Sequence, residues 1–339
     1  MATEKKVLLK VRNLKQWFPI KTMFWEKKKY VKAVNDVSFD VYEGETLGIA
    51  GESGCGKSTL IRSCLHLLTP TDGTVEFEGQ EVAKASNRQL RPIRQFMQMI
   101  FQDPYASLDG RWTVKQLIEE PMIVNKLCAS KEERQAKVRE LLEAVSISQE
   151  YVNRYPHEFS GGQRQRIAIA SALATDPKLV MCDEPVSALD VSVRAQVLNL
   201  LKDLQEERGL TYIFVSHDMS VIEYLCDRIA IMYLGKIVEI GTKDEIFNNP
   251  QHPYTKALLS AVPKATEQAD LTKRIILEGD IPSPVNPPSG CVFRTRCKYA
   301  TERCACEVPQ VQQVADGHNV CCHLVQGTPV QEQTATADV

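Results

Sequence analysis

The sequence predicts an α/β fold built on a mostly parallel sheet. Short apolar runs, such as Leu179 to Cys182 and Tyr212 to Val215, alternate with amphipathic helical segments. This alternation is typical of strands joined by crossover helices. One junction carries a glycine-rich loop between the apolar run Thr46 to Ala50 and the helical segment Leu60 to Leu68. A strand, a glycine-rich loop and a helix in this order indicate a nucleotide-binding α/β protein.

The loop matches the pattern G-x-x-x-x-G-K-[ST]. Glycines let consecutive backbone N–H groups surround an anion, and the following helix N-terminus adds a partial positive charge. We expect Lys57 to reach the β- and γ-phosphates of ATP and the Ser58 hydroxyl to bind Mg²⁺. The predicted ATP-binding residues of the loop are Gly51, Glu52, Ser53, Gly54, Cys55, Gly56, Lys57, Ser58 and Thr59.

The composition is that of an ordinary globular protein. The chain has 339 residues, 43% hydrophobic and 25% charged, which allows one large and one smaller domain. The net charge of −2 gives no indication of nucleic-acid binding. No run of 18 apolar residues is present, and Met1 to Lys6 lacks the apolar core of a signal peptide. We therefore expect a cytoplasmic protein that does not itself span a membrane.

Two further segments carry candidate chemistry. Asp183 and Glu184 follow the apolar run Leu179 to Cys182, a Walker B pattern in which Asp183 holds Mg²⁺ and Glu184 acts as the general base. The second segment precedes the helical stretch Arg164 to Ala174, where a hydroxyl and two glycine amides at a helix N-terminus could bind an anion. Its alternative role is a simple helix cap. The segment is Ser160, Gly161, Gly162 and Gln163.

With Phe159 before it, this tetrapeptide resembles the signature of ATP-binding-cassette (ABC) ATPases. The resemblance implies that the signature binds the γ-phosphate of ATP held by the opposite subunit. It also implies that the loop containing Ser187 and Asp190 crosses the dimer interface. Because each ATP site needs a phosphate loop and a signature from different chains, the working unit is expected to be a dimer.

The same resemblance assigns three more positions in the family's order. It implies that Gln102 contacts Mg²⁺ and the attacking water, and that His217 is the switch histidine near the γ-phosphate. It implies that Phe18, or alternatively Trp17, stacks on adenine. Phe18 could instead be a core residue.

The resemblance also implies a domain plan. A nucleotide-binding domain would span residues 1–248, with a mostly parallel sheet, an antiparallel β part and a helical subdomain at about 104–172. A small cysteine-rich C-terminal domain of the oligopeptide/dipeptide-transporter type would span 249–326, and a polar tail 327–339.

The C-terminal segment narrows the family. A proline-rich connector, Ile281 to Pro288, lies between His252 to Leu259 and Gly290 to Cys297. Together these stretches look like the F-type ATPase subunits of dipeptide and oligopeptide importers. The resemblance implies a second ABC ATPase subunit in a heterodimer, two transmembrane permeases and an extracytoplasmic peptide-binding protein, with this chain peripheral at the cytoplasmic face of the plasma membrane.

Other functions stay open at this point. The cargo could be a haem precursor, a metal or an antimicrobial peptide. A soluble cassette acting on DNA or ribosomes would usually carry two cassettes, a coiled coil or a basic surface. In a metal-binding regulatory module, ATP would only switch the conformation; the presence of Glu184 and His217 argues against that.

Six of the eleven cysteines lie between residues 291 and 322, with C-x5-C-x6-C spacing that lacks the C-x2-C pairs of zinc ribbons. The family resemblance implies a [4Fe–4S] cluster. Cys321 is the alternative fourth ligand, and Cys306 does not belong to the family's four-cysteine pattern. Six thiols that bind no metal are the alternative to a cluster. The implied ligands are Cys291, Cys297, Cys304 and Cys322.

Overall fold

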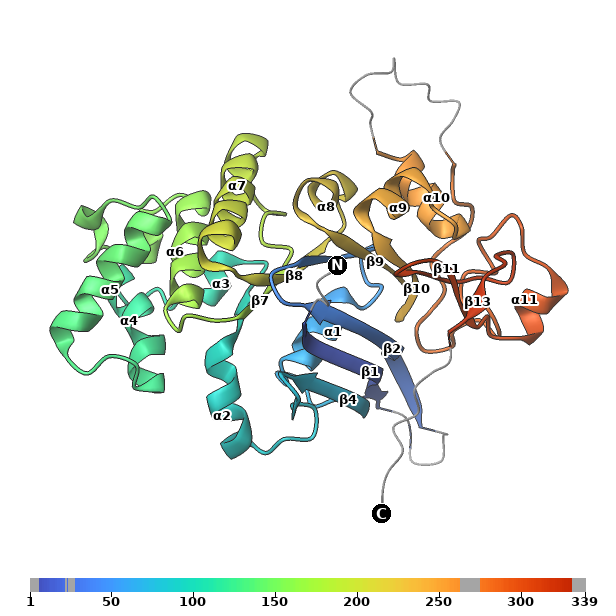
Figure 1. Ribbon diagram of the computed structural model, residues 1–339, viewed down its shortest axis with the longest axis horizontal. Helices are drawn as coiled ribbons and strands as arrows, with labels where there is room; N and C mark the ends of the chain where they lie inside the picture. Colours follow the sequence, from blue (N-terminus) through green and yellow to red (C-terminus); the bar gives the residue numbers. More distant parts are fainter. Residues whose placement is uncertain (1–5, 22, 24–27, 263–274, 331–339) are drawn as a thin grey trace.

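The computed structural model describes residues 6–21, 23, 28–262 and 275–330 (Figure 1). Its larger sheet has the strand order β13-β11-β12-β10-β9-β3-β8-β7-β6. The five strands from β9 to β6 are mutually parallel and almost fully buried, as expected for a sheet covered on both faces. They are β3 (Thr46–Ala50), β6 (Met97–Ile100), β7 (Leu179–Asp183), β8 (Thr211–Ser216) and β9 (Arg228–Tyr233). The predicted parallel sheet is confirmed.

A second, antiparallel sheet has the order β2-β1-β4-β5. Its apolar face packs on helix α1 (Lys57–Cys64), and α1 packs on the larger sheet, so one core cluster runs through all three layers. The strands are β1 (Val7–Ile20), β2 (Lys29–Tyr42), β4 (Asp72–Phe77) and β5 (Gln80–Glu81), and helix α2 (Asn87–Phe96) follows them. This sheet is the antiparallel part that the sequence predicts.

Helices gather on one side of the larger sheet between residues 104 and 173 (Figure 1). The helix over Lys131–Ala144 begins after Ser130, whose hydroxyl accepts from the Glu133 N–H at 3.1 Å. Its buried face carries Val138, Leu141 and Leu142. The group consists of α3 (Pro104–Ser107), α4 (Val114–Asn125), α5 (Lys131–Ala144), the 3-10 turns Gln149–Tyr151 and Pro156–Glu158, and α6 (Gly161–Leu173).

The remaining helices are short, apart from α7. Helix α7 ends at Gly209, which adopts a left-handed conformation with φ 63°. In the described part of the chain, no helix is long and apolar enough to cross a membrane. The helices are α7 (Val191–Arg208), α8 (Met219–Leu225), α9 (Lys243–Asn248), α10 (Pro253–Ser260) and α11 (Glu302–Cys306).

A separate cysteine-rich C-terminal domain is predicted by the sequence, and the structure does not support it. The C-terminal strands pair onto β10 (Lys236–Thr242) and extend the larger sheet. Cys291, Phe293 and Cys304 belong to the same core cluster as β8 and β9. Pairing with the C-terminal strands covers β10, which would otherwise be an exposed edge. These strands are β11 (Val311–Ala315), β12 (His318–Cys321) and β13 (Thr328–Pro329).

The polar tail predicted from residue 327 is therefore partly structured. Thr328 and Pro329 pair with β11 in the register Gln313 to Thr328 and Gln312 to Pro329. Residues 331–339 of that predicted tail lie outside the described residues.

Candidate active site

The glycine-rich loop connects β3 to α1 and has a backbone that other residues could not adopt. A Cβ atom on Gly51 would lie 2.2 Å from the Met232 carbonyl oxygen, and one on Gly56 would lie 2.1 Å from the Ala33 carbonyl oxygen. Gly56 also has φ 110°, outside the range of ordinary L-residues. The loop is thus held closely against β2 and β9. This close packing leaves a backbone cradle of the kind that holds phosphate groups.

Lys57 is 5% exposed and points back over the loop. Its ammonium donates to the Gly51 carbonyl at 2.7 Å and to the Glu52 carbonyl at 3.1 Å. Cys55, also in the loop, is a packing residue. Burial raises the pKa of its thiol, although the nearby Lys57 charge opposes this effect, so the thiol stays protonated at neutral pH.

The predicted magnesium ligands Ser58 and Asp183 are brought together. The Ser58 hydroxyl donates to Asp183 Oδ1 at 2.6 Å, and Asp183 is fully buried at the end of β7. Arg62, one turn further along α1, donates to Asp183 Oδ2 at 3.0 Å. A hydroxyl and a carboxylate are hard oxygen ligands of the kind that Mg²⁺ prefers. The chemistry of this pair therefore suits Mg²⁺.

Glu184 lies directly after β7 with φ 46°, an uncommon conformation for a residue with a side chain. Its N–H donates to the Val215 carbonyl of β8 at 3.1 Å, which fixes the backbone in this turn. Its Oε2 accepts from Gln102 Nε2 at 3.2 Å and lies 3.1 Å from His217 Nδ1. The three predicted catalytic side chains thus converge from the ends of β6, β7 and β8.

The segment Ser160 to Gln163 forms the N-terminus of α6. The Ser160 hydroxyl accepts from the Gln163 N–H at 3.4 Å, and Gln163 Oε1 accepts from the Ser160 N–H at 3.0 Å. This capping box confirms that Ser160 caps the helix. In the described ranges, no hydrogen bond joins this segment to the phosphate loop of the same chain, and Gly161 is half-buried.

The adenine-stacking prediction concerns neighbouring residues of β1 that face opposite sides. The Trp17 ring lies 6.3 Å from the Tyr30 ring, with the Lys32 ammonium 5.1 Å from its centre. Phe18 is the next residue of the strand, so its half-buried side chain projects from the other face. Phe18, with Trp17 as the alternative, stays the predicted adenine-stacking residue.

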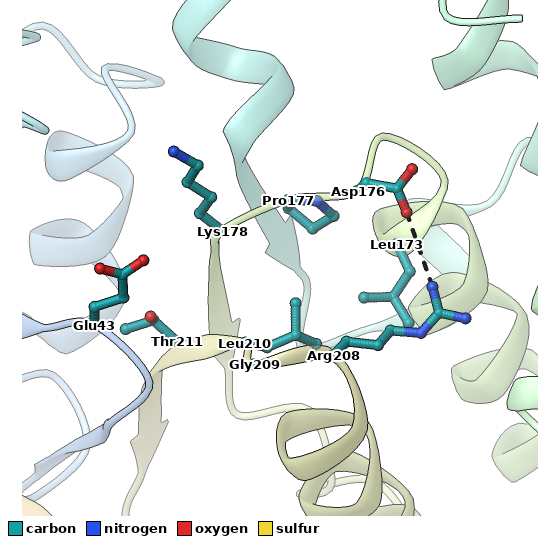
Figure 2. Close-up of a pocket in the computed structure, with 9 residues that line it drawn as sticks. All are labelled: Glu43, Leu173, Asp176, Pro177, Lys178, Arg208, Gly209, Leu210 and Thr211. Carbon is teal, nitrogen blue, oxygen red and sulfur yellow. Dashed lines mark ion pairs between the residues drawn. The ribbon is translucent and has the colours of Figure 1, made fainter.

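A hollow of about 450 Å³ lies at the other end of the parallel strands (Figure 2). Lys178 and Thr211, on its wall, stand at the starts of β7 and β8, whereas the phosphate loop follows the end of β3. Its cations are engaged with nearby carboxylates, including Arg208 with Asp176 at 3.8 Å. This hollow is therefore separate from the candidate nucleotide site.

Comparison with known proteins identifies the family. Residues 34–187 match the family described as ABC transporter, and residues 238–304 match the oligopeptide/dipeptide transporter C-terminal region. The oligopeptide transport ATP-binding protein AppF of Bacillus subtilis (strain 168) is 49% identical over 326 residues, covering 95% of this chain and 99% of AppF. The chain belongs to the ABC transporter ATPase family.

Other members extend this result. The oligopeptide transport ATP-binding protein OppF of Salmonella typhimurium is 49% identical over 326 residues, covering 94% of this ABC ATPase and 96% of OppF. The dimeric ATP-binding cassette MJ0796, solved with ADP and Pi, is 31% identical with a TM-score of 0.62, covering 70% of this chain and 99% of that chain. The cassette cbiO1 from Clostridium perfringens is 26% identical with the same TM-score, covering 73% and 92%.

The predicted dimer loop of this ABC ATPase connects Glu184, the predicted general base, to α7. The Ser187 hydroxyl donates to the Glu184 carbonyl at 3.0 Å. Asp190 stands at the N-cap position of α7, where its carbonyl accepts from the Arg194 N–H at 2.8 Å. Asp190 makes no side-chain cap hydrogen bond. The loop is therefore hydrogen-bonded to the backbone of Glu184 through Ser187. Its role at a dimer interface stays a prediction.

The four cysteines predicted as cluster ligands come from different turns of the C-terminal segment. The Cys291 N–H donates to the Cys304 carbonyl at 2.8 Å. Burial raises the pKa of Cys291 to about 11, with smaller contributions in the same direction from Cys304, Cys322 and Cys297. Within the described ranges, however, no three His, Cys, Asp or Glu side chains are arranged to hold a metal ion. The predicted iron–sulfur site is not supported by this arrangement.

The two extra cysteines differ from these four. Cys306 is exposed, and the Cys321 thiol donates to the Pro309 carbonyl at 3.0 Å. Cys322 is 8% exposed, and its pKa is raised by burial and by Cys297 and Cys304. The pKa of Cys321 is likewise raised, mainly by burial and also by Cys291 and Cys322, so the choice between Cys321 and Cys322 stays a prediction.

Sequence reasoning missed three residues around the nucleotide site. Arg62 pairs with Asp183, Tyr254 accepts from the Glu52 N–H at 2.9 Å, and Arg296 pairs with the Glu52 carboxylate. Arg62 lies one helical turn after Ser58 on α1, and this spacing was the one available signal. Tyr254 and Arg296 lie more than 200 residues from Glu52 in the sequence, so no local pattern connects them.

Proposed function

We propose that this ABC ATPase hydrolyses ATP to power a peptide importer. The observation that carries the enzymatic part is the convergence of Gln102 and His217 on the Glu184 carboxylate, next to the Ser58 and Asp183 pair. A carboxylate at this point can orient and polarise the attacking water. Mg²⁺ bound by Ser58, Asp183 and Gln102 would neutralise phosphate charge when present. The residues of this chain bind and orient the nucleotide around that charge.

The peptide cargo follows from the relatives and from the C-terminal match. Both AppF and OppF are named as oligopeptide transport ATP-binding proteins, and the matched C-terminal region bears the oligopeptide/dipeptide transporter description. Haem precursors, metals and antimicrobial peptides are the alternative cargoes. Cargo selection would lie mainly in other subunits.

The functional unit proposed is a head-to-tail pair of cassettes. The signature from Ser160 to Gln163 lies at an exposed helix N-terminus, where backbone N–H groups suit a phosphate of another chain. The related cassette MJ0796 was solved as a dimer. We propose a heterodimer with a second ABC ATPase subunit, with Ser187 and Asp190 near the shared interface.

Two permeases and an extracytoplasmic peptide-binding protein would complete the importer. The helical side of the chain exposes large apolar side chains, including Tyr105 at 66% and Ile123 at 55% exposure. Exposed large apolar side chains are typical of protein contact surfaces when they gather in a patch. We place this surface against the cytoplasmic parts of the permeases, which makes the ATPase a peripheral subunit at the cytoplasmic face of the plasma membrane.

We also propose a [4Fe–4S] cluster bound by Cys291, Cys297, Cys304 and Cys322. The support comes from the sequence spacing of these cysteines and from the effect of each thiol on the pKa of its neighbours. Four thiolates are the ligand set of a cubane cluster. A structural role is proposed, because no hydrolysis step needs an electron. Because no three His, Cys, Asp or Glu side chains of the described residues are arranged to hold a metal ion, binding of the cluster would require these side chains to rearrange.

The function can be tested with the four-subunit transporter in proteoliposomes. ATP should drive accumulation of a labelled di- or tripeptide, delivered by the binding protein, and the Glu184→Gln transporter should not accumulate it. A haem precursor and a metal ion serve as competing cargoes. Uptake of either one without peptide uptake would reject the peptide assignment and keep the ATPase assignment. ATP hydrolysis that does not depend on the permeases would reject the transport role.

A further inference from the structure

The C-terminal segment contacts the phosphate loop through one ion pair. Arg296 Nη1 lies 2.7 Å from Glu52 Oε2, and Nη2 lies 3.1 Å from Glu52 Oε1. The two parallel contacts form a bidentate pair, the most specific geometry for an arginine and a carboxylate. The Arg296 side chain is only 7% exposed and that of Glu52 26%, so water screens this pair less than a surface pair.

Aromatic side chains hold the arginine in place. The Arg296 guanidinium lies 6.0 Å from the centre of the Tyr233 ring, and the Tyr233 ring lies 5.2 Å from the Phe293 ring and 4.7 Å from the Tyr254 ring. All three rings are almost fully buried. Because a packed ring lies beside its guanidinium, Arg296 needs little reordering to meet Glu52.

The backbone of Glu52 is held from the same side. Its N–H donates to the Tyr254 hydroxyl at 2.9 Å, and Tyr254 belongs to α10. The Glu52 carbonyl accepts from Lys57, the lysine predicted to contact the phosphates. Glu52 is thus the residue at which the C-terminal segment, α10 and the phosphate-binding lysine meet.

The negative charge of Glu52 lies in the phosphate loop and has to be neutralised for ATP to bind. A carboxylate in a loop that has to hold a triphosphate repels the bound anion unless a positive charge neutralises it. Lys57 contacts the Glu52 carbonyl, whereas Arg296 contacts the Glu52 carboxylate. The neutralisation of this acid therefore comes from a residue 244 positions further along the chain.

We propose that Arg296 is a positioning residue for ATP binding: it neutralises the Glu52 carboxylate and fixes the start of the phosphate loop, so that the C-terminal segment sets the affinity for ATP. The proposal depends on ATP binding at the phosphate loop and is independent of cargo. It also does not require a metal in the C-terminal segment.

A double-mutant cycle tests this role in the full-length protein. The equilibrium Kd for a fluorescent ATP analogue with Mg²⁺ is measured for wild type, Arg296→Gln, Glu52→Gln and the double variant. We expect Arg296→Gln to raise Kd about tenfold, because a buried pair is replaced by an unpaired carboxylate near the phosphates. Glu52→Gln in the same chain should restore Kd to within about threefold of wild type, since the repelling charge is gone.

Two more variants make the result specific. Arg294→Gln is the matched control, because Arg294 belongs to the same segment and, among the described residues, its side chain hydrogen-bonds only to the Ser289 carbonyl and hydroxyl; its Kd should equal that of wild type. Arg296→Lys keeps the charge but loses the bidentate geometry, so its Kd should lie between those of wild type and Arg296→Gln. This variant also keeps the test valid if Arg296→Gln does not fold.

The outcomes distinguish charge neutralisation of Glu52 by Arg296 from a purely structural contact between the two side chains. If the double variant binds ATP as weakly as Arg296→Gln, Arg296 acts only as a structural support and the proposal is rejected. An unchanged Kd in Arg296→Gln also rejects it. Failure of all variants, including wild type, to bind the analogue would instead contradict the assigned ATP site.

Discussion

The Oε2 atom of Glu184 lies 3.1 Å from the Nδ1 atom of His217, and the Gln102 amide approaches the same oxygen at 3.2 Å. The carboxylate proposed as the general base therefore has its partners in place in the isolated subunit. Two hydrogen-bonding side chains on one carboxylate oxygen fix its direction, while the other oxygen keeps its capacity to accept from water. This arrangement makes Glu184 the first residue to test.

Replacement of Glu184 by glutamine should abolish turnover and preserve ATP binding. The amide keeps the shape of the side chain but cannot accept a proton, so we expect kcat in the assembled transporter to fall about 10²-fold or more. Nucleotide affinity should change little, because Lys57 and the loop backbone are untouched. Glu132→Gln, an exposed change on α5, is the control. Near-normal turnover of Glu184→Gln would show that Glu184 is not the general base.

The signature prediction is best tested at Gly161. A Cβ atom on Gly162 would lie 2.3 Å from Val193 Cγ1, so Gly162→Asp would also disturb the packing of α6 on α7. On Gly161 the nearest atom is Leu189 Cδ2 at 3.7 Å, an ordinary contact. Gly161→Asp should therefore leave ATP binding by the monomer intact and prevent ATP-driven dimerisation, since its carboxylate would repel the partner's ATP.

Analytical ultracentrifugation with ATP, in the Glu184→Gln background, measures that dimerisation. Gly110→Asp is the control, because no atom lies within 4 Å of the added Cβ. A Gly161→Asp protein that forms the dimer as wild type does would show that the signature does not face the partner's nucleotide. Loss of binding in the monomer would show that it belongs to the same-chain site.

Local patterns predicted the catalytic elements well. The strand Thr46–Ala50 ends where the sequence indicates, and the Ser160 cap and the parallel strands are confirmed. Strand β1 continues to Ile20, well past the apolar residues at its start, because pairing with β2 and β4 supports its polar residues. Strand β11, with two glutamines, has little apolar alternation and depends on β12 for its formation.

Contacts between distant residues could not be predicted in this way. The pairs of Glu52 with Arg296 and of His318 with Glu239 join residues 244 and 79 positions apart. His318 is fully buried, and its other ring nitrogen lies 2.6 Å from Glu245. A sequence window contains only one partner of each pair. For the same reason, the sequence indicated a separate C-terminal domain where the structure has strands of the main sheet.

The proposed cluster makes a spectroscopic prediction. Protein purified anaerobically should be brown and carry about four irons per chain. Serine at any of the four proposed ligands should remove the colour, because each one supplies a thiolate. Serine at Cys306 or Cys321 should not, since the former is exposed and the latter is bonded to the Pro309 carbonyl. The proposed ligands are Cys291, Cys297, Cys304 and Cys322.

Iron and acid-labile sulfide analysis of each variant makes the measurement quantitative. Colourless anaerobic protein with stoichiometric zinc would reject the cluster and keep a metal site. Protein that contains neither iron nor zinc would show that these cysteines are unligated thiols and would reject the metal site. Loss of colour in Cys321→Ser but not in Cys322→Ser would move the fourth ligand by one residue.

The last prediction concerns the pH dependence of stability. Burial lowers the pKa of His252 from 6.5 to about 4, with Glu239 opposing this shift and Lys256 adding to it. The folded state therefore favours the neutral imidazole, whose Nδ1 accepts from the Tyr254 N–H at 3.1 Å at the start of α10. Because the pKa is lower in the folded state, the stabilisation is complete above pH 6.5 and is lost as the pH falls towards about 4. The loss should be on the order of 3 kcal/mol.

Glu239 has a separate pH range. Burial raises its pKa, but hydrogen bonds from His318 and Thr255 and from the backbone of Gln251 and His252 outweigh burial and lower the pKa below 4.5. Its contribution is therefore present above that value and is lost at lower pH. Between pH 6.5 and 4.5, a loss of stability is therefore expected from His252 and not from Glu239.

Urea unfolding of the full-length protein at about pH 7 and about pH 5 measures the difference in unfolding free energy. In His252→Asn, the side-chain oxygen can still cap α10 but does not titrate, so the decrease between these two pH values should be smaller than in wild type. His157→Asn, a change at an exposed histidine, is the control and should retain the wild-type pH dependence. Parallel loss of stability in wild type and His252→Asn would show that His252 does not govern this transition. A steeper loss in His252→Asn would mean that the buried imidazole protects the fold against acid, the opposite sign to the one derived.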